Sequence, residues 1–476
     1  MADKKTFYLT TPIFYPNANL HLGHAYVTTL CDVLARYHRL IGDSTYFLTG
    51  SDENAQTVLQ GAKKAGKEPE VFLEEIVANF KKLFSGLNIS YDQFIRTSDK
   101  QVHWPGAIAL WKKLVDAGDI YKKEYIGLYC IGHEAFITEK ELVDGKCPDH
   151  GTVPEVVKEE NYFFRLSKYT DPIKQKIESD ELLIVPSTRK KEILSFLEEG
   201  LQDVSFSRPK TSNAVGIPVP GDDSQVMYVW CDALSNYITA LGYGRDDDSL
   251  YKEFWPGMHV VGKDILRFHA AIWPGMLMSA GIELPKKIFV HGMITSGGKK
   301  MSKTRGNVID PMELLNEYGT EAVRYFLSRH VSPVEDSELT PEGLKEIYNA
   351  DLANGLGNLV ARVMKLTEIY LTDGPQVSAP IFPPEYVDAL EKFEINRAID
   401  CVFRLITELD QEITKTEPFK VIKIDQAEGT KLILDLILKL YIIGVLLEPF
   451  MPETSKKILE AVRTRKKPEN LFARKD

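Results

Sequence analysis

The N-terminal part of the chain, residues 6–48, alternates between patterns typical of strands and of a helix. Residues 6–12 form a short apolar run that predicts a buried strand. From Gly23 to Ile41, apolar residues recur at helical spacing, and Gly42 ends the predicted helix. A second strand is expected to begin at residues 45–48. This order, with short connections, indicates the opening of a doubly wound α/β sheet.

The tetrad His21-Leu22-Gly23-His24 falls at the start of the predicted helix. Backbone N–H groups and the helix dipole favour anions at such a position. Two imidazoles three residues apart project side by side toward one phosphate, and Gly23 between them allows close approach of a ligand. The alternative is a helix that happens to begin with two histidines.

A second segment with the chemistry of a phosphate site is a basic loop, Ser296 to Asn307. Its paired glycines supply a hinge, and Lys300 and Lys303 can then fold over the β- and γ-phosphates of a nucleotide. The alternative is a solvated loop. A second basic patch, Arg463–Lys467, is either a solvated tail or an RNA contact.

Composition narrows the class of protein. The chain has 476 residues with 44% hydrophobic and 26% charged residues, as in a globular enzyme of several domains. Its net charge of −10 argues against indiscriminate nucleic-acid binding, and its five cysteines are too few for a disulfide framework. No apolar run reaches the roughly 18 residues that span a bilayer. Residues 1–5 lead directly into a strand, so no membrane association and a cytoplasmic location are expected.

Taken together, the His21 tetrad and the run Lys-Met-Ser-Lys-Thr-Arg-Gly-Asn from Lys300 are the two signatures of class I aminoacyl-tRNA synthetases. Residues 6–465 resemble the methionyl-tRNA synthetases. The resemblance implies that methionine and ATP, with Mg²⁺, give methionyl-adenylate, and that the methionyl group passes to the 3′ end of tRNA(Met). It implies catalytic roles for His21, His24, Lys300 and Lys303. The residues expected to bind ATP are His21, Gly23, His24, Gly262, Asp264, Lys300, Met301, Ser302 and Lys303.

The same resemblance implies an α/β fold with a Rossmann-type, doubly wound parallel catalytic domain. Its two halves are expected at 1–120 and 221–295, split by an inserted connective-peptide domain at 121–220, where glycines, prolines and charges become frequent. The basic loop and a stem-contact region are expected at 296–345. An all-α anticodon-binding bundle is expected at 346–476, because the sequence reads as helices only from about Asp310.

An apolar pocket suited to a thioether is expected around the segment Tyr228–Tyr237. Asp52 matches the carboxylate that pairs with the substrate ammonium group, while Asn54 stands where the family usually has histidine. An ordinary core helix would explain the aromatic residues of the segment but not Asp232 and Asn236 in the same turn. The residues expected to bind methionine are Pro12, Ile13, Tyr15, Asp52, Trp230, Ala233, Leu234, Tyr237, Ile265 and His269.

Two Cys-x-x-His pairs occur within the insertion. Thiolate and imidazole ligands in two tight turns suit a structural, tetrahedral Zn²⁺, and the alternative is a metal-free remnant of such a knuckle. The family usually has cysteine at the second of these positions. The four candidate ligands are Cys130, His133, Cys147 and His150.

The helical part carries a polar stripe at Asn354, Asn358 and Arg362, opposite an apolar face that runs from Leu352 to Leu366. Amide and guanidinium groups can read the edges of splayed bases. In the family this stripe reads the CAU anticodon, and the alternative is a hydrated face. Phe419 stands where the family commonly has a tryptophan that stacks on an anticodon base, so retained but weaker stacking is expected.

Two other functions remain open at this point. The chain could be a class I synthetase for isoleucine, valine, leucine or cysteine, although the insertion looks too short for a separate editing domain. It could also be a tRNA-binding relative without catalysis, although His21, His24, Lys300 and Lys303 are all present. No further tRNA-binding or dimerising module is recognised after the helices, so a monomer is expected.

Overall fold

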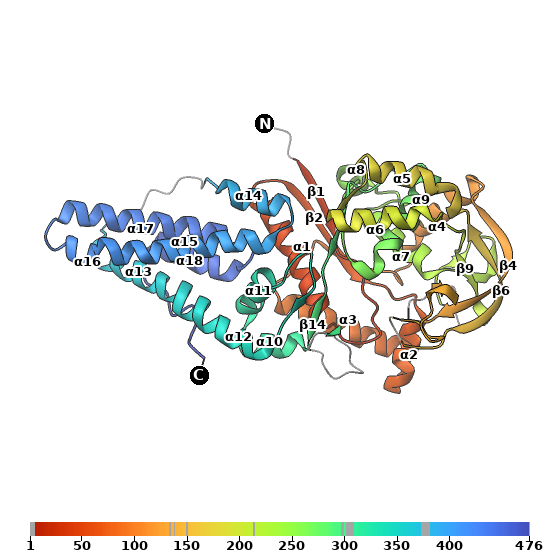
Figure 1. The fold of residues 1–476 in the computed structure, drawn as a ribbon, viewed down its shortest axis with the longest axis horizontal. Coiled ribbons are helices and arrows are strands. Elements are labelled where there is room, and N and C mark those ends of the chain that lie inside the picture. The colour runs from red at the N-terminus through yellow and green to blue at the C-terminus, as the bar shows by residue number, and fades with distance from the viewer. Residues whose placement is uncertain are drawn as a thin grey trace. The chain divides into compact units, whose positions relative to one another are not determined.

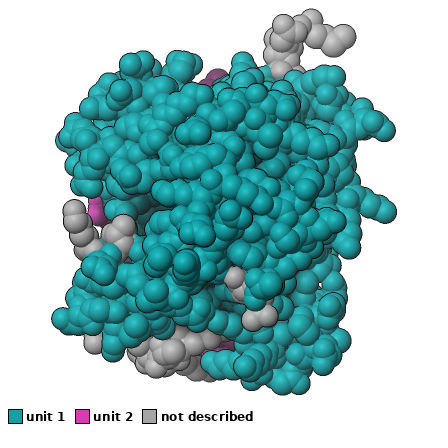
Figure 2. Space-filling model, turned by 90° about the vertical axis from the view of Figure 1, so that its right-hand side faces the viewer, with its two compact units in different colours: residues 1–20, 43–82, 91–291 teal, residues 21–42, 83–90, 292–476 magenta. Residues whose placement is uncertain are grey.

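A computed structural model describes residues 5–132, 135–137, 139–148, 151–212, 215–296, 299–300, 309–372 and 381–475. The chain divides into two compact units, coloured separately in Figure 2. The first unit comprises residues 1–20, 43–82 and 91–291, and the second comprises residues 21–42, 83–90 and 292–476.

The first unit is built on a sheet of six parallel strands (Figure 1), in the order β3-β2-β1-β12-β13-β7. The strands are β1 Thr6–Thr10, β2 Ser44–Ser51, β3 Gln93–Arg96, β7 Leu183–Val185, β12 Met258–Gly262 and β13 Lys287–His291. The order runs outward in both directions from β1 and β12, so the topology reverses between these two strands. Ligands of doubly wound sheets bind beyond the carboxyl ends of the strands at such a point. The predicted α/β class is confirmed, and so are the strands expected at residues 6–12 and 45–48, which the structure has as β1 and β2.

Helices of the first unit surround an apolar core that includes Trp111, Trp273 and Ile288. Helix α7 is buried on all sides, and α4 packs against both α7 and α9. The helices of this part of the chain are α2 Gln56–Ala65, α3 Pro69–Gly86, α4 Trp104–Asp116, α5 Thr170–Glu178, α6 Ser187–Glu198, α7 Val229–Thr239, α8 Ser249–Phe254, the π-helix η5 Phe268–Ile272 and α9 Trp273–Ala280. Short 3₁₀ turns are η1 Glu139–Glu141, η2 Leu166–Tyr169, η3 Lys210–Ser212 and η4 Lys263–Ile265.

The segment predicted as an insertion contains antiparallel strands. β4 Ile120–Cys130 pairs with β6 Glu155–Phe164 in a sheet of order β5-β4-β6-β8, with β5 Ala135–Ile137 and β8 Val204–Ser205. A second small sheet, β10-β11-β9, contains β9 Ser207–Pro209, β10 Pro218–Val219 and β11 Asp222–Met227. Strand β7, which lies between β6 and β8 in the chain, pairs with β13 of the parallel sheet. The segment 121–220 therefore contributes one strand to the central sheet, and its second small sheet is completed by β11, which begins after residue 220.

The second unit is mainly helical. Its helices are α1 Leu22–Leu40, α10 Pro311–Tyr318, α11 Thr320–Arg329, α12 Pro341–Ile347, the π-helix η7 Tyr348–Gly357, α13 Asn358–Tyr370, α14 Pro384–Glu391, α15 Ile395–Thr416, α16 Pro418–Val421, α17 Gln426–Leu446 and α18 Pro452–Thr464. A small sheet, β15-β14-β16, is formed by β14 Ile294–Ser296, β15 Lys299–Lys300 and β16 Ser337–Glu338. The expectation of helices only after Asp310 is wrong at β16, whose two residues are too few to leave an alternating pattern.

A buried ion pair ties α1 to the other helices of its unit. Asp32 and Arg324 are both fully buried, with 2.7 Å between Asp32 Oδ2 and Arg324 Nη1. Arg36 Nε and the backbone N–H of Ser90 also donate to the Asp32 carboxylate, while Arg324 donates to the Phe450 carbonyl oxygen. Because these donors come from distant segments, α1 packs as part of the helical unit. Among the described residues, no helix is long and apolar enough to cross a bilayer.

Candidate active site

The candidate methionine residues of the first unit follow the carboxyl ends of neighbouring parallel strands. Residues 12–15 follow β1 and Asp52 follows β2. The Asp52 N–H donates to the Phe14 carbonyl oxygen at 3.0 Å, and the Phe14 N–H donates to the Gly50 carbonyl oxygen at 3.0 Å. Pro12, Ile13 and Tyr15 therefore lie on the segment directly beside Asp52, whose side chain is only 3% exposed.

Helix α7 supplies an aromatic wall. Trp230, Ala233, Leu234 and Tyr237 are all buried, and they recur at helical spacing along one face. The Trp230 ring stacks on Phe268 with 3.7 Å between the ring centroids and 10° between the planes. The Tyr237 and His269 rings lie 5.7 Å apart, next to the half-buried Ile265 segment of η4. The structure thus brings the predicted α7 residues and His269 together.

His269 is held as a neutral acceptor. Its Nδ1 lies 2.9 Å from the Ile265 carbonyl oxygen, which can only accept, so Nδ1 carries the proton. Nε2 then accepts a hydrogen bond from the Tyr237 hydroxyl group at 2.7 Å. Burial lowers the pKa of His269 to about 4, and burial raises the pKa of Tyr237 above its ordinary value. Both groups therefore remain uncharged near neutral pH, which suits a site for an uncharged thioether.

A second buried histidine supports this wall. His259 Nε2 accepts from the Trp273 indole N–H at 3.1 Å, and its Nδ1 lies 2.9 Å from Thr10 Oγ1. The His259 ring is 4.1 Å from the Tyr237 ring between centroids. Burial lowers the pKa of His259 well below its usual range. His259 could not be singled out from the sequence, because it lies within the apolar strand β12.

Asn54 and His103 converge on Asp232. The Asn54 amide donates to Asp232 Oδ2 at 2.7 Å, and His103 Nε2 lies 2.5 Å from Asp232 Oδ1. Asp232 and His103 are fully buried. Asn54 thus has a defined partner, whereas its side chain had no assigned role from the sequence. His103 was not predicted, since an isolated histidine before a helix carries no pattern.

Arg208 is another residue that the sequence did not reveal. It lines a small cavity together with Asn54, Tyr228 and Val229. Its Nη2 donates to Glu159 Oε1 at 2.7 Å, and the buried Nη1 has no hydrogen-bond partner among the described residues. Because the Arg208 guanidinium group is already paired with the Glu159 carboxylate and lies 4.1 Å from the centroid of the Tyr129 ring, it is held in place at the edge of this cavity.

The candidate ribose-binding residues are Gly262, the last residue of β12, and Asp264 in the following η4. Gly262 caps η4, and a Cβ atom at this position would lie 2.7 Å from Asp264 Oδ1. Asp264 itself is exposed. A side chain at position 262 would therefore displace the exposed Asp264 carboxylate from its present position.

In the second unit, His21 and His24 form a capping box at the start of α1. His21 Nδ1 accepts from the Gly23 N–H at 3.0 Å, and His24 Nδ1 accepts from the His21 N–H at 3.1 Å. Each neutral ring therefore carries its proton on Nε2, and the ring centroids are 3.9 Å apart. A Cβ atom at Gly23 would lie 2.9 Å from His21 Cε1, so a side chain at this position would displace the His21 ring.

Several predicted residues fall outside the described residues. Met301, Ser302 and Lys303 do so, and for Lys300 only the backbone in β15 is described. His133 and His150 also lie outside. Cys130, at the end of β4, and Cys147, which follows the bridge between Val143 and Lys146, are each 1% exposed. Among the described residues no group of three potential metal ligands occurs, but two of the four candidate ligands are not among them.

The helix with the predicted polar stripe changes its geometry partway. Residues Tyr348–Gly357 are π-helical and Asn358 begins α13, whereas one continuous α-helix was expected. Leu352, Leu356, Leu359 and Val363 are nevertheless fully buried, and Asn354 and Asn358 are exposed. Arg362 forms an ion pair with Asp410 of α15. Phe419, in α16, is 37% exposed.

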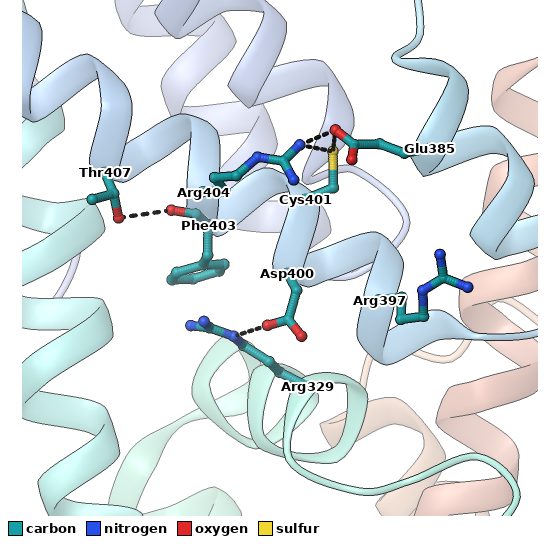
Figure 3. Close-up of a pocket in the computed structure, with 8 residues that line it drawn as sticks. All are labelled: Arg329, Glu385, Arg397, Asp400, Cys401, Phe403, Arg404 and Thr407. Atoms are coloured by element: carbon teal, nitrogen blue, oxygen red, sulfur yellow. Dashed lines mark hydrogen bonds and ion pairs between the residues drawn. The ribbon is translucent and has the colours of Figure 1, made fainter.

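A larger cavity of about 470 Å³ lies within the helical unit (Figure 3). Its walls come from α11, α14 and α15, and its charged residues include three arginines. Arg329 Nε lies 2.7 Å from Asp400 Oδ1, Arg404 is paired with Glu385, and Arg397 is paired with Glu394. Each guanidinium group thus already faces a carboxylate, which disfavours this cavity as an anion site.

Comparison with known proteins gives consistent matches. A family model described as "tRNA synthetases class I (M)" matches residues 7–153 and 149–364. The methionine–tRNA ligases of Clostridium acetobutylicum and Clostridium perfringens are each 44% identical, over 96% and 97% of this chain and 73% and 74% of their own length. The methionyl-tRNA synthetase of Mycobacterium tuberculosis, solved with methionyl-adenylate, superimposes with a TM-score of 0.88 at 37% identity. That match covers 96% of this chain and 93% of the other.

Proposed function

The chain belongs to the methionyl-tRNA synthetases of class I, and on this premise we propose how its residues act as a methionine–tRNA ligase. The enzyme is an ATP-dependent ligase. The methionine carboxylate oxygen attacks the α-phosphate of ATP, the bond to the β-phosphate oxygen breaks, and pyrophosphate leaves. A terminal hydroxyl group of the tRNA then attacks the methionyl carbonyl carbon, and AMP leaves.

The observation that carries this function is the uncharged Tyr237–His269 pair in the aromatic wall of α7, with Asp52 at the end of the neighbouring strand β2. Asp52 receives the substrate ammonium group, and the wall receives the thioether. The wall residues are Trp230, Ala233, Leu234, Tyr237, Ile265 and His269, with Pro12, Ile13 and Tyr15 beside Asp52. Thioethers pack favourably against aromatic rings, and a neutral Tyr–His pair imposes no charge on them.

The adenylation step needs donors for the charge on the phosphoryl oxygens. His21 and His24 supply them through Nε2–H, because their Nδ1 atoms are occupied by backbone N–H groups. Gly262 and Asp264 hold the ribose. Lys300 and Lys303 meet the β- and γ-phosphates, with Gly23, Met301 and Ser302 completing the ATP site.

Two metal ions belong to this proposal. Mg²⁺ accompanies ATP and neutralises its phosphates. Zn²⁺ would be held by Cys130, His133, Cys147 and His150, and the buried thiols of Cys130 and Cys147 at two turns suit such a structural ion. Zinc analysis of the purified protein tests this: about one equivalent is expected, and protein with full exchange activity but no zinc would contradict it.

The RNA partner is tRNA(Met). Asn354, Asn358 and Arg362 read the anticodon and Phe419 stacks on one of its bases, which the exposure of Asn354, Asn358 and Phe419 supports. Residues 346–476 form the anticodon-binding part, and residues 296–345 the basic loop and stem-contact region. The enzyme acts as a monomer in the cytoplasm.

Charging of a tRNA(Met) transcript with radiolabelled methionine tests the proposal. The unaltered protein should charge it, and a transcript whose CAU anticodon is replaced should be a poor substrate. Replacing His21 or His24 by alanine should lower kcat by about 10²–10³ for a lost phosphate donor. Full activity without both imidazoles would contradict the assignment.

A further inference from the structure

A buried hydrogen-bond network joins three segments of the first unit. Both N–H groups of the Asn54 amide are used, one on Asp232 Oδ2 at 2.7 Å and one on the Thr97 carbonyl oxygen at 3.1 Å. His103 Nε2 lies 2.5 Å from Asp232 Oδ1. His103 Nδ1 lies 2.8 Å from Thr239 Oγ1, so the ring is held on both sides. The Asp232 carboxylate therefore has a fixed donor on each oxygen atom.

The network lies where the parts of the proposed methionine site meet. Asn54 is two residues after Asp52, on the segment that follows β2. Asp232 lies in the first turn of α7, between the wall residues Trp230 and Ala233. Thr97 and His103 belong to the segment between β3 and α4. The bonds therefore connect the ammonium partner to the helix that forms the thioether wall.

Stability alone is a weak reason for such a network. A buried carboxylate loses its hydration, and apolar residues of similar volume often stabilise a core as well or better. What a fully bonded carboxylate adds is a defined geometry. In a catalytic site, small displacements of the groups that hold a substrate reduce the rate strongly, so a defined geometry has direct value here.

We infer that Asn54 and His103 are positioning residues for methionine, because through the Asp232 carboxylate they fix α7 against the segment that carries Asp52. Neither residue needs to contact the substrate. This inference rests on the proposed function, and it adds that the separation between the ammonium partner and the thioether wall is set by this network.

Two substitutions of Asn54 test the inference by methionine-dependent ATP–pyrophosphate exchange. Asn54→Ala removes both donors, and the nearly isosteric Asn54→Asp places a second carboxylate against Asp232. Both should lower kcat/KM for methionine by about 10–100-fold, mainly through KM, as expected for misplaced binding groups. KM for ATP should stay within about twofold. The preference for methionine over norleucine, which has CH₂ in place of sulfur, should also fall.

A second pair of variants separates donor loss from loss of packing. In His103→Gln the amide nitrogen can take the place of Nε2, so kcat/KM for methionine should be largely retained. His103→Leu removes the donor and should resemble Asn54→Ala. The matched control is Asn79→Ala, because Asn79 donates to Asn19 on the exposed surface. Thermal unfolding shows whether each variant is folded. If an Asn54 variant does not fold, the comparison of His103→Gln with His103→Leu tests the inference instead.

Methionine KM within twofold of the unaltered chain in Asn54→Ala, Asn54→Asp and His103→Leu would overturn the inference. Equal shifts in the KM values for methionine and ATP, with an unchanged norleucine ratio, would also overturn it, because they would indicate general loss of structure. Absence of methionine-dependent exchange in the unaltered chain would instead contradict the proposed function itself, so the two failures are distinguishable.

Discussion

The Tyr237 hydroxyl group donates a hydrogen bond to His269 Nε2 at 2.7 Å, inside a region where both side chains are at most 2% exposed. The direction of this bond is set from the far side of the imidazole, where the Ile265 carbonyl oxygen requires a proton on Nδ1. The Ile265 carbonyl oxygen thereby determines which nitrogen of His269 accepts the hydrogen bond from Tyr237.

Removing the hydroxyl group in Tyr237→Phe should weaken methionine binding. His269 Nε2 would lose its donor inside the core, which costs about 1–3 kcal/mol. We therefore expect KM for methionine in ATP–pyrophosphate exchange to rise about tenfold, with KM for ATP unchanged. The control is Tyr121→Phe on the half-buried strand β4. This change removes a hydroxyl group that donates a hydrogen bond to Asp203. Equal KM values for methionine in the two variants would show that the Tyr237–His269 pair does not belong to the methionine site.

The neutral state of His269 gives stability a pH dependence. Its pKa is about 4 in the folded chain against 6.5 for an ordinary histidine. Between these values the unfolded chain binds a proton that the folded chain does not, so the free energy of unfolding falls as pH drops from about 6.5 to 4. The difference corresponds to about 3 kcal/mol. Urea unfolding of the unaltered chain and His269→Gln across this range should show a smaller fall in the variant. Parallel curves would contradict the prediction.

Breaking the Asp32–Arg324 pair is expected to destabilise the helical unit. Burial by itself would raise the pKa of Asp32. The guanidinium groups of Arg324 and Arg36 outweigh burial and hold this pKa below its ordinary value. Asp32→Asn leaves the fully buried Arg324 without its counter-charge, and breaking a buried pair costs about 3–5 kcal/mol. Chemical unfolding measures this loss. Glu75→Gln, in an exposed pair with Lys67, should cost less than about 1 kcal/mol, and similar losses in both would refute the account.

Phe419 should contribute to tRNA binding and not to adenylation. Stacking of one base on an aromatic ring is worth about 1–3 kcal/mol. Phe419→Ala should therefore raise KM for tRNA(Met) in aminoacylation, Phe419→Trp should lower it, and neither should change ATP–pyrophosphate exchange. Ile424→Ala, at an exposed position after the same short helix, is the control. Unchanged aminoacylation in the alanine variant would exclude Phe419 from the anticodon site.

What the sequence could predict depended on whether residues lie in patterns. The first strands and the helix between them left clear periodicity, so β1, β2 and α1 were predicted to within a few residues, whereas the short strands β3 and β7 were not predicted. Trp230, Tyr237 and His269 lie in motifs, and the structure brings them together. Asn54, His103 and Arg208 could not be assigned, because their partners, Asp232 and Glu159, are distant in sequence. The π-helix at Tyr348–Gly357 was missed, since it buries the same leucines as an α-helix would.

The central claim is that the pocket bounded by Asp52 and the α7 wall admits methionine for activation by ATP. Measuring ATP–pyrophosphate exchange with each of the twenty protein amino acids, supplied singly, tests it most directly. We predict that methionine supports exchange and that isoleucine, valine, leucine and cysteine do not approach it in kcat/KM. Exchange driven best by another amino acid, or absent with all of them, would contradict the account.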